Sequence, residues 1–138
     1  MTDDWTRIAQ TTLDGSESDT MSFPESVAIL MEAGFDGYGV DLRAGTRIFY
    51  RPDGAAITLE AAPSRPVAAR FDAPQVRDAI REAQQKVPGY TYRGFCAKVA
   101  EAGCAGYLVS FPGQRVLYVG RSGETHTEYF PGAQPEAR

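Results

Sequence analysis

The alternation of apolar and polar positions occurs twice along this chain. The segment 32–40 (EAGFDGYGV) returns as segment 101–109 (EAGCAGYLV), at a constant offset of 69 residues. Over the longer windows 22–54 and 91–123 most positions stay apolar against apolar. A unit with one apolar face has to bury that face against something, and the other copy is the obvious partner. The pattern therefore predicts a domain built by internal duplication.

In the first copy the periodicity predicts two helices followed by three strands. A short helix over 4–13 ends at the stop signal Asp14-Gly15-Ser16. A second helix over 23–33 begins with a capping box, because Ser22 and Glu25 can each satisfy a free amide of the first turn. Strict alternation then predicts the strands of an antiparallel meander at 38–42, 47–51 and 55–60.

The second copy repeats this order after a connector over 61–73. Within the connector, 67–71 has the composition of a short extra strand at a sheet edge. The clearest helix of the chain covers 74–86, and another begins at the N-cap Thr91 and ends at Gly103. Three strands are predicted after it, at 107–111, 115–119 and 124–130.

These elements predict a single α+β domain over 1–138, with antiparallel strands and the helices packed on one side. Repeat unit 1 covers about 4–60 and repeat unit 2 about 74–130, and we expect the tail 131–138 to fray. The two meanders can form one continuous sheet or two facing sheets. The pattern leaves this choice open.

Composition narrows the class of protein without revealing its chemistry. The chain has 138 residues, of which 43% are apolar, and a formal net charge of −4 at pH 7. No cluster of Lys and Arg breaks this acidic background, so we expect no nucleic-acid partner. We also expect a cytoplasmic protein with no membrane partner, because neither a secretory signal nor a membrane-spanning apolar run is present.

Neither cysteine fits a catalytic or metal-binding pattern. Cys96 falls where the first copy has Val27, and Cys104 falls where it has Phe35, so both are predicted to fill buried apolar positions. Phosphate-binding loops, nucleophile elbows and zinc-protease motifs are also missing from the sequence. We therefore assign no catalytic residue, no metal and no cofactor, and a non-enzymatic protein is favoured.

Both copies place a glutamate in the last turn of a helix, where the helix dipole disfavours negative charge. One interpretation pairs Glu32 and Glu101 with two arginines, Arg47 and Arg115, which a one-residue slip in the second strand brings into alignment. The other places the two glutamates on a groove as a pseudo-symmetric acidic pair. Ion pairing is the favoured interpretation, because structural ion pairs outnumber functional ones.

Three further side chains are candidates for ligand binding. Tyr38 and Tyr107 recur at the same position, where core packing with a wet hydroxyl is the default and a ligand anchor in a shared cleft is the alternative. His126, the single histidine, lies between Glu124 and Glu128, and alternation places all three on one face of a strand. A solvated edge strand is favoured there over a raised histidine pKa or a weak metal site.

The order of motifs along the chain resembles that of one family. The run Phe-Pro-Glu-Ser-Val from residue 23, the two Glu-Ala-Gly segments, Phe71-Asp72 and Gln84-Gln85 follow one another as in the YdfO-like (YbcV-like) family of small uncharacterised bacterial proteins. Some of its members carry a "phage envelope protein" label. The resemblance covers nearly the whole chain and implies an α+β domain of unknown function, with no catalytic residues. The acidic loop 14–19 departs from the family pattern.

Two classes of function follow. The favoured one is a non-enzymatic binding or protein-interaction module, whose outer strands pair with another chain, for example in a homodimer. The alternative is a small-molecule-binding protein or weak enzyme with a site between the repeats, drawing on Glu32, Glu101, Tyr38, Tyr107 or His126. A polar-lined cavity holding both glutamates unpaired would favour the alternative. Packing without a cavity, with both glutamates bridged to arginine, would exclude it.

Overall fold

The computed structural model describes residues 2–61 and 63–131. Two helices followed by three strands occur twice, in a first half and a second half. The first half contains α1 (Thr2–Glu17), α2 (Phe23–Glu32), β1 (Gly37–Asp41), β2 (Thr46–Tyr50) and β3 (Ala56–Glu60). The second half contains α3 (Ala73–Gln85), α4 (Tyr92–Glu101), β4 (Cys104–Ser110), β5 (Arg115–Gly120) and β6 (Thr125–Tyr129). Beyond Pro131, the predicted tail lies outside the described residues.

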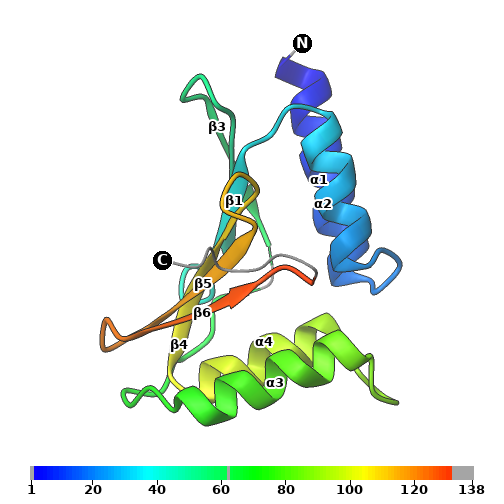
Figure 1. Ribbon diagram of the computed structural model, residues 1–138. Coiled ribbons are helices and arrows are strands. Elements are labelled where there is room, and N and C mark those ends of the chain that lie inside the picture. Colours follow the sequence, from blue (N-terminus) through cyan, green and yellow to red (C-terminus); the bar gives the residue numbers. More distant parts are fainter. Residues whose placement is uncertain (1, 62, 132–138) are drawn as a thin grey trace, which may run out of the picture.

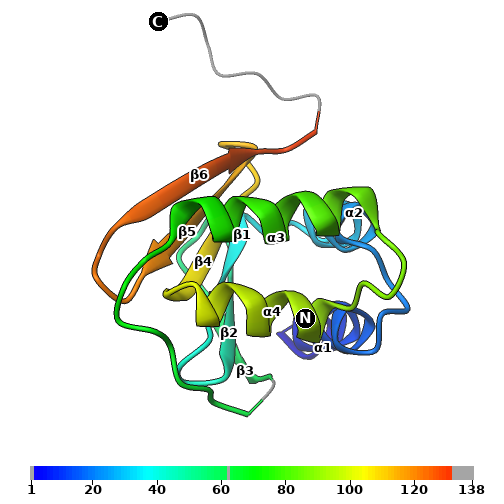
Figure 2. The ribbon, with the colours of Figure 1, turned by 90° about the horizontal axis from the view of Figure 1, so that it is seen from below.

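All six strands form one antiparallel sheet in the order β3-β2-β1-β4-β5-β6. Both helix pairs, α1 with α2 and α3 with α4, lie on the same side of this sheet (Figure 1). In the view from below, α3 and α4 lie in front and α1 and α2 are seen end-on behind them (Figure 2). The α+β prediction with helices on one side is confirmed. The choice between one sheet and two is decided in favour of one continuous sheet.

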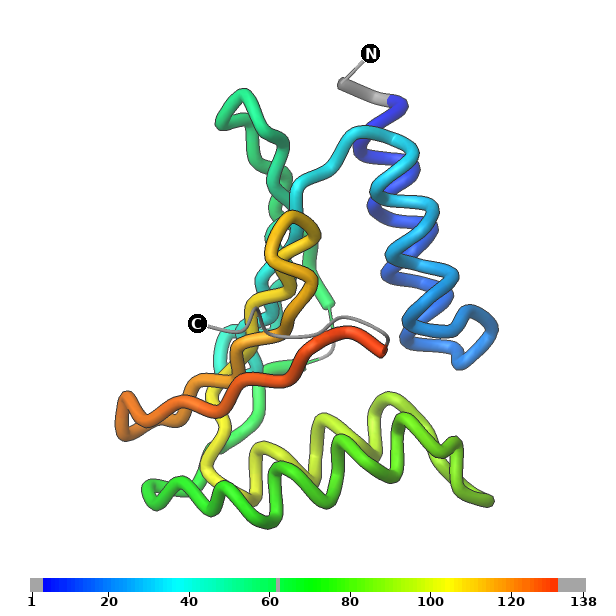
Figure 3. Tube along the Cα trace, in the orientation of Figure 1, coloured from blue at the N-terminus to red at the C-terminus, as the bar shows by residue number. Residues whose placement is uncertain are grey.

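The halves meet at the centre of the sheet, where β1 pairs with β4 (Figure 3). Gly39 pairs with Leu108, which is its own counterpart at the offset of 69, and the pair Tyr38–Val109 is mirrored by the pair Val40–Tyr107. This pairing has an approximate twofold axis between Gly39 and Leu108. The register of both meanders keeps the same offset. Duplication of the chain itself stays an interpretation of the sequence.

Two repeated glycines allow the central strands to approach each other. A Cβ atom at Gly37 would lie 2.3 Å from the carbonyl oxygen of Val109, and a Cβ atom at Gly106 would lie 2.3 Å from that of Val40. Carbon and oxygen atoms that are not bonded cannot approach so closely, so the pairing of β1 with β4 requires glycine at both positions. The two contacts are counterparts of one another, which supports the approximate twofold symmetry.

Two element predictions are wrong. Helix α1 continues through the predicted stop at 14–16, and Gly15 is part of the helix. A Cβ at this position would lie 2.6 Å from the Cβ of Met21, so the glycine serves close packing and does not end the helix. The glycine lets the α1–α2 loop fold back closely onto the helix. The segment 67–71 forms no strand, and its apolar residues Val67 and Phe71 are instead buried in the core. The capping box of α2 and the N-cap of α4 are confirmed.

The slip that aligned Arg47 with Arg115 is also wrong. With the offset of 69 kept by the register, the counterpart of Arg47 is Val116, and the counterpart of Arg115 is Thr46. Successive side chains of a strand point to opposite faces, so a shift by one residue exchanges the faces. Arg47 is therefore buried beneath the helices, whereas Arg115 is half-buried and contacts the ring of Tyr129.

The inner face of the sheet and the apolar faces of the helices enclose one core. Its largest fully buried apolar side chains are Phe49, Leu13, Leu30, Val76, Val99 and Val109. Cys96 and Cys104 are free and buried in it, which confirms the prediction that they fill apolar positions. Burial raises the pKa of both thiols, that of Cys104 to about 11. Among the described residues, no helix combines the length and the apolar character needed to cross a membrane.

Candidate functional site

A cavity of about 240 Å³ lies over the inner face of the sheet, between the two helix pairs. Most of its wall is aromatic or aliphatic. These apolar and ring-bearing wall residues are Met21, Phe23, Pro24, Tyr38, Ile80, Ala83, Tyr90, Tyr92, Phe95, Tyr107, Val116, Tyr118, Tyr129, Phe130 and Pro131. Holding one water takes roughly 10–15 Å³, so the space can accommodate a small organic molecule. We call it the central cavity.

The tips of the two helix pairs are tied together beside the central cavity. The carboxylate of Asp19, in the α1–α2 loop, accepts a hydrogen bond from the backbone N–H of Tyr92 at 2.8 Å. Arg93 Nε lies 3.0 Å from Glu17 Oε1 in an ion pair. Because the first amides of a helix lack partners within the helix, Asp19 both satisfies a free donor of α4 and lies favourably near its positive end. The acidic loop thus joins the two halves.

Arg47 lies in the wall of the central cavity and is 2% exposed. Its guanidinium carbon lies 4.8 Å from the ring centre of Tyr38 and 5.5 Å from that of Tyr92, and its Nη2 donates to the Tyr92 hydroxyl at 2.8 Å. Within the described part of the chain, no carboxylate forms an ion pair with Arg47. Its Nε is buried without a hydrogen-bond partner, a situation shared only with Ser26 Oγ among the described side chains. Arg47 is a buried cation without a counter-ion.

The hydroxyls around Arg47 are neutral phenols. Burial raises the pKa of Tyr92, and it raises that of Tyr107 well above the ordinary value, so both keep their protons at pH 7. Their hydroxyl oxygens lie 2.6 Å apart. Burial disfavours the charged form of Arg47 and the surrounding tyrosines favour it, with the result that its pKa lies above the ordinary value. The guanidinium is therefore charged at pH 7.

Two more hydroxyls have no partner in the protein. Tyr38 and Tyr118 are buried and line the central cavity, and their hydroxyls form no hydrogen bond with any described residue. Burial raises the pKa of both phenols, so they too are neutral at pH 7. Neither oxygen is among the fully buried side-chain atoms without a partner, so both hydroxyls are accessible from the cavity. These groups are available to a molecule that occupies the cavity.

The structure brings together only some of the residues that the sequence suggested. Tyr38 and Tyr107 lie in the wall of the central cavity. Glu32 and Glu101 are exposed at the ends of α2 and α4, outside the cavity wall, and neither forms an ion pair with a described residue. The ion-pair interpretation is wrong, because Arg47 faces the core. Exposure lets water screen both carboxylates from the helix dipole.

His126 lies next to the cavity wall without being part of it. Its Nε2 is 2.6 Å from Glu128 Oε2, and its ring stacks on Tyr118 with ring centres 6.4 Å apart. Glu128 does line the central cavity, whereas Glu124 accepts a hydrogen bond from the hydroxyl of Ser122. Across the described ranges, no group of three or more His, Cys, Asp or Glu side chains is placed to hold a metal ion.

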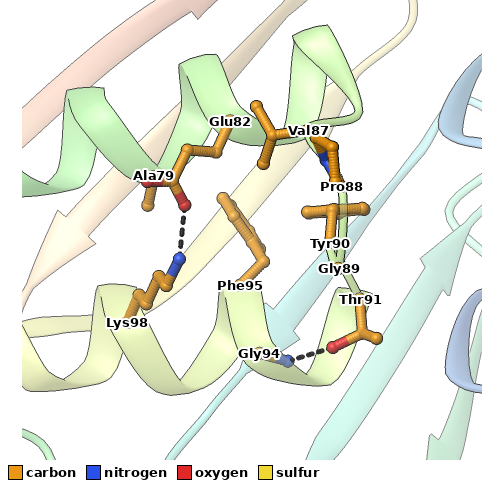
Figure 4. Close-up of a pocket in the computed structure, with 10 residues that line it drawn as sticks. All are labelled: Ala79, Glu82, Val87, Pro88, Gly89, Tyr90, Thr91, Gly94, Phe95 and Lys98. Carbon is orange, nitrogen blue, oxygen red and sulfur yellow. Dashed lines mark hydrogen bonds and ion pairs between the residues drawn. The ribbon is translucent and has the colours of Figure 1, made fainter.

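A second, smaller pocket of about 130 Å³ lies between α3 and α4 (Figure 4). Figure 4 shows Phe95 pointing from α4 toward α3 between the two helices. The polar groups at its border are already paired, Lys98 with Glu82 and the Gly94 amide with the hydroxyl of Thr91. Unlike the central cavity, this pocket offers a ligand no buried polar group that lacks a partner.

The sequence interpretation missed Arg47, Tyr92, Tyr118 and Glu128 as residues of one site. A signal for Arg47 was present, because the offset of 69 without a slip makes it the counterpart of the apolar residue Val116. An arginine at such a position calls for a buried partner. Tyr92 gave no comparable signal, since its approach to Arg47 depends on how α4 packs over the sheet.

Comparison with known proteins adds no relative from which a role could be transferred. No family model matches the chain, and a search of the curated proteins finds no match. The relation to the YdfO-like family therefore stays a prediction. The functional argument rests on the geometry of the central cavity.

Proposed function

We propose that the protein binds a small, largely apolar organic molecule in the central cavity. The observation that carries this proposal is a space of about 240 Å³ left open between the two halves, larger than the pocket of about 130 Å³ between α3 and α4. Ligand sites in proteins are typically concave, mostly apolar, and furnished with a few convergent polar groups. Aromatic rings, Arg47 and the unpartnered hydroxyls of Tyr38 and Tyr118 match that description.

The groups near the cavity favour binding over catalysis. Cys96 and Cys104 are buried outside the cavity wall, and their raised pKa values keep the thiols protonated at pH 7. Glu128 is an acidic side chain of the wall that could act as a base, and it is already hydrogen-bonded to His126. Covalent catalysis requires a nucleophile held against a base, and the described residues of the wall include no such pair.

Pairing through an edge strand is a second candidate function. The free edges of the sheet are β3 and β6, each of five residues. Short edge strands are a common protection against pairing, and this favours the cavity as the functional feature. Light scattering separates the two: a mass that rises with concentration supports a dimer through an edge, and a strict monomer at high concentration removes that candidate.

A filled cavity tests the proposal. Ala83 is half-buried in the wall, so Ala83→Phe should place a ring in the space and abolish binding. Ala28→Phe, on the exposed face of α2, is the matched control and should leave binding unchanged. The probes are naphthoate and its neutral analogue naphthamide, followed by heteronuclear NMR at millimolar concentration. If neither probe shifts the resonances of the wall residues in the wild-type protein, the proposal is overturned.

A further inference from the structure

We infer that the ligand of the central cavity carries a carboxylate, and that this group supplies the counter-ion that Arg47 lacks. The inference deepens the proposed function and rests on it. It concerns one part of the wall, the group of Arg47, Tyr38, Tyr92 and Tyr107, which we call the donor end of the cavity.

The donor end has more hydrogens than acceptors. A guanidinium has five N–H donors and no acceptor. Arg47 uses one of them, from Nη2 toward the hydroxyl of Tyr92, and its Nε–H is fully buried without a partner. Its Nη1 also forms no hydrogen bond with a described residue and is not among the fully buried atoms, so it is the donor that a ligand can reach first. Apart from the Tyr92 hydroxyl, no acceptor among the described residues binds the guanidinium of Arg47. The remaining donors need an acceptor that the protein does not supply.

The two linked phenols add to this surplus. The hydroxyls of Tyr92 and Tyr107 share one hydrogen bond, and each carries one hydrogen. If Tyr92 donates to Tyr107, the hydrogen of Tyr107 is left over. If Tyr107 donates, the hydrogen of Tyr92 is left over. Either way one phenolic hydrogen has no oxygen acceptor among the described residues, and the only other acceptor beside Tyr92 is the weakly accepting thiol of Cys96, so this end of the cavity has donors to spare.

A carboxylate fits the donor end better than a neutral acceptor. It brings the negative charge that a buried guanidinium needs, and its two oxygens can accept from two neighbouring N–H groups in one plane. Beyond the donor end most of the wall is apolar, with Phe95, Ile80 and Val116, and its polar members are Ser16, Asp19, Ser22, Gln84, Lys86 and Glu128. The rest of the ligand is therefore a compact apolar body, such as an aromatic ring or a short aliphatic chain.

The side of the cavity opposite the donor end determines the orientation of the ligand. Glu128, on β6, lies two strands away from Tyr107 on β4, a separation of roughly 10 Å at the usual spacing between strands. A second carboxylate near Glu128 would be repelled. The anionic group of the ligand therefore lies at Arg47, with the apolar body toward Val116 and Tyr118.

Two probes that differ only in charge test the inference. At pH 7 naphthoate is an anion, and naphthamide is a neutral molecule of nearly the same shape. We expect the wild-type protein to bind naphthoate at least about tenfold more tightly, as a charge-assisted hydrogen bond predicts. The Nε–H resonance of Arg47 should shift on binding of naphthoate and stay in place with naphthamide. Inorganic phosphate, as a third probe, tells whether an anion without an apolar body suffices.

Variants assign the preference to Arg47. Arg47→Met should remove the preference for naphthoate, while Arg47→Lys should keep part of it, because lysine preserves the charge without the planar fork. Arg115→Met is the matched control, since Arg115 lies outside the cavity wall, and it should keep the full preference.

The outcomes separate this inference from the proposed function. Equal binding of naphthoate and naphthamide by the wild-type protein overturns the carboxylate and leaves the binding site intact. Binding of neither probe overturns both. A preference that survives in Arg47→Met overturns the role of Arg47. If that variant does not fold, the Nε–H resonance in the wild-type protein decides, and a resonance unmoved by bound naphthoate overturns the inference.

Discussion

The two halves of the molecule share one backbone and differ in what they place beneath the helices. At three counterpart positions facing the helices the first half has an apolar residue and the second half a polar one: Phe49 against Tyr118, Ile57 against His126, and Leu59 against Glu128. In the first half the rings of Phe35 and Phe49 pack edge to face, 6.0 Å apart, as in an ordinary core. In the second half the hydroxyl and the carboxylate of the same positions face the central cavity.

Two positions that border the cavity sharpen this contrast. Phe23 and Tyr92 are counterparts at the first residue of α2 and α4, and both line the cavity. Phe23 makes a ring contact with Phe130, whereas Tyr92 accepts a hydrogen bond from Arg47. Arg47 comes from the first half, and its counterpart is Val116. Positions at which the two halves have similar residues form the common fold, and several positions at which the halves have different residues line the cavity.

The largest expected effect tests the part that the halves share. Gly37→Ala and Gly106→Ala should each lower the free energy of unfolding by about 3 kcal/mol, because each added Cβ collides with a backbone oxygen of the opposite half. Gly39→Ala is the control in the same strand, since the nearest atom to its Cβ would be 3.9 Å away, and should cost less than about 1 kcal/mol. Urea unfolding measures all three. Unequal losses at Gly37 and Gly106 would contradict the twofold relation.

A smaller effect tests the polar substitutions of the second half. Burial raises the pKa of Tyr118, so above its ordinary pKa of about 10 the folded state keeps a proton that the unfolded chain loses. The stability from this group is complete below about pH 10 and is lost as pH rises from there toward the folded pKa, by about 1.4 kcal/mol per pH unit. Tyr118→Phe, the residue of the counterpart Phe49, should therefore flatten the alkaline decline.

Unfolding midpoints in urea, measured from neutral pH to above pH 11, follow this decline. Tyr50→Phe is the control, because Tyr50 is 38% exposed and lies outside the cavity wall. It should leave the slope as in the wild-type protein. Equal slopes for Tyr118→Phe and the wild-type protein would show that Tyr118 is not a buried neutral phenol.

The smallest effect concerns the tie between the halves. Asp19→Ala removes the acceptor of the Tyr92 amide and should cost about 1 kcal/mol, as the loss of a helix cap does. Hydrogen exchange at that amide should accelerate, and bound naphthoate should dissociate faster. Asp78→Ala, on the exposed face of α3, serves as the control. An unchanged exchange rate at Tyr92 in Asp19→Ala would mean that the tie does not form.

Local signals were enough to predict the order of elements and the helix ends. The capping box at Ser22 and Glu25 acts within one turn, so its residues specify it without help from the rest of the chain. The register of the central strands depends instead on the contact of Gly37 with the backbone of Val109, which belongs to the other half. Sequence periodicity contains no such contact. The one-residue slip that aligned Arg47 with Arg115 therefore could not be rejected from the sequence, and it assigned Arg47 to the wrong face of the sheet.

The cavity itself could not be predicted for the same reason. Its wall combines residues of all four helices, the α1–α2 loop and five strands, and its volume depends on how far the helix pairs stand apart. The recurrence of Tyr38 and Tyr107 pointed to two of its residues. The partners of these tyrosines, Arg47 and Tyr92, are positions where the two halves differ, and a search for repeated residues passes over them.

Unfolding of Arg47→Met in urea, with and without naphthoate, tests the central claim most directly. An unpaired buried charge costs stability, so without the probe the variant should be as stable as the wild-type protein or more stable by about 1 kcal/mol. With naphthoate present, the wild-type protein should gain more stability than it gains from naphthamide, and the variant should gain no more from naphthoate than from naphthamide. A loss of about 3 kcal/mol or more without the probe, together with an undiminished gain from naphthoate, would show that Arg47 supports the fold and does not bind the ligand.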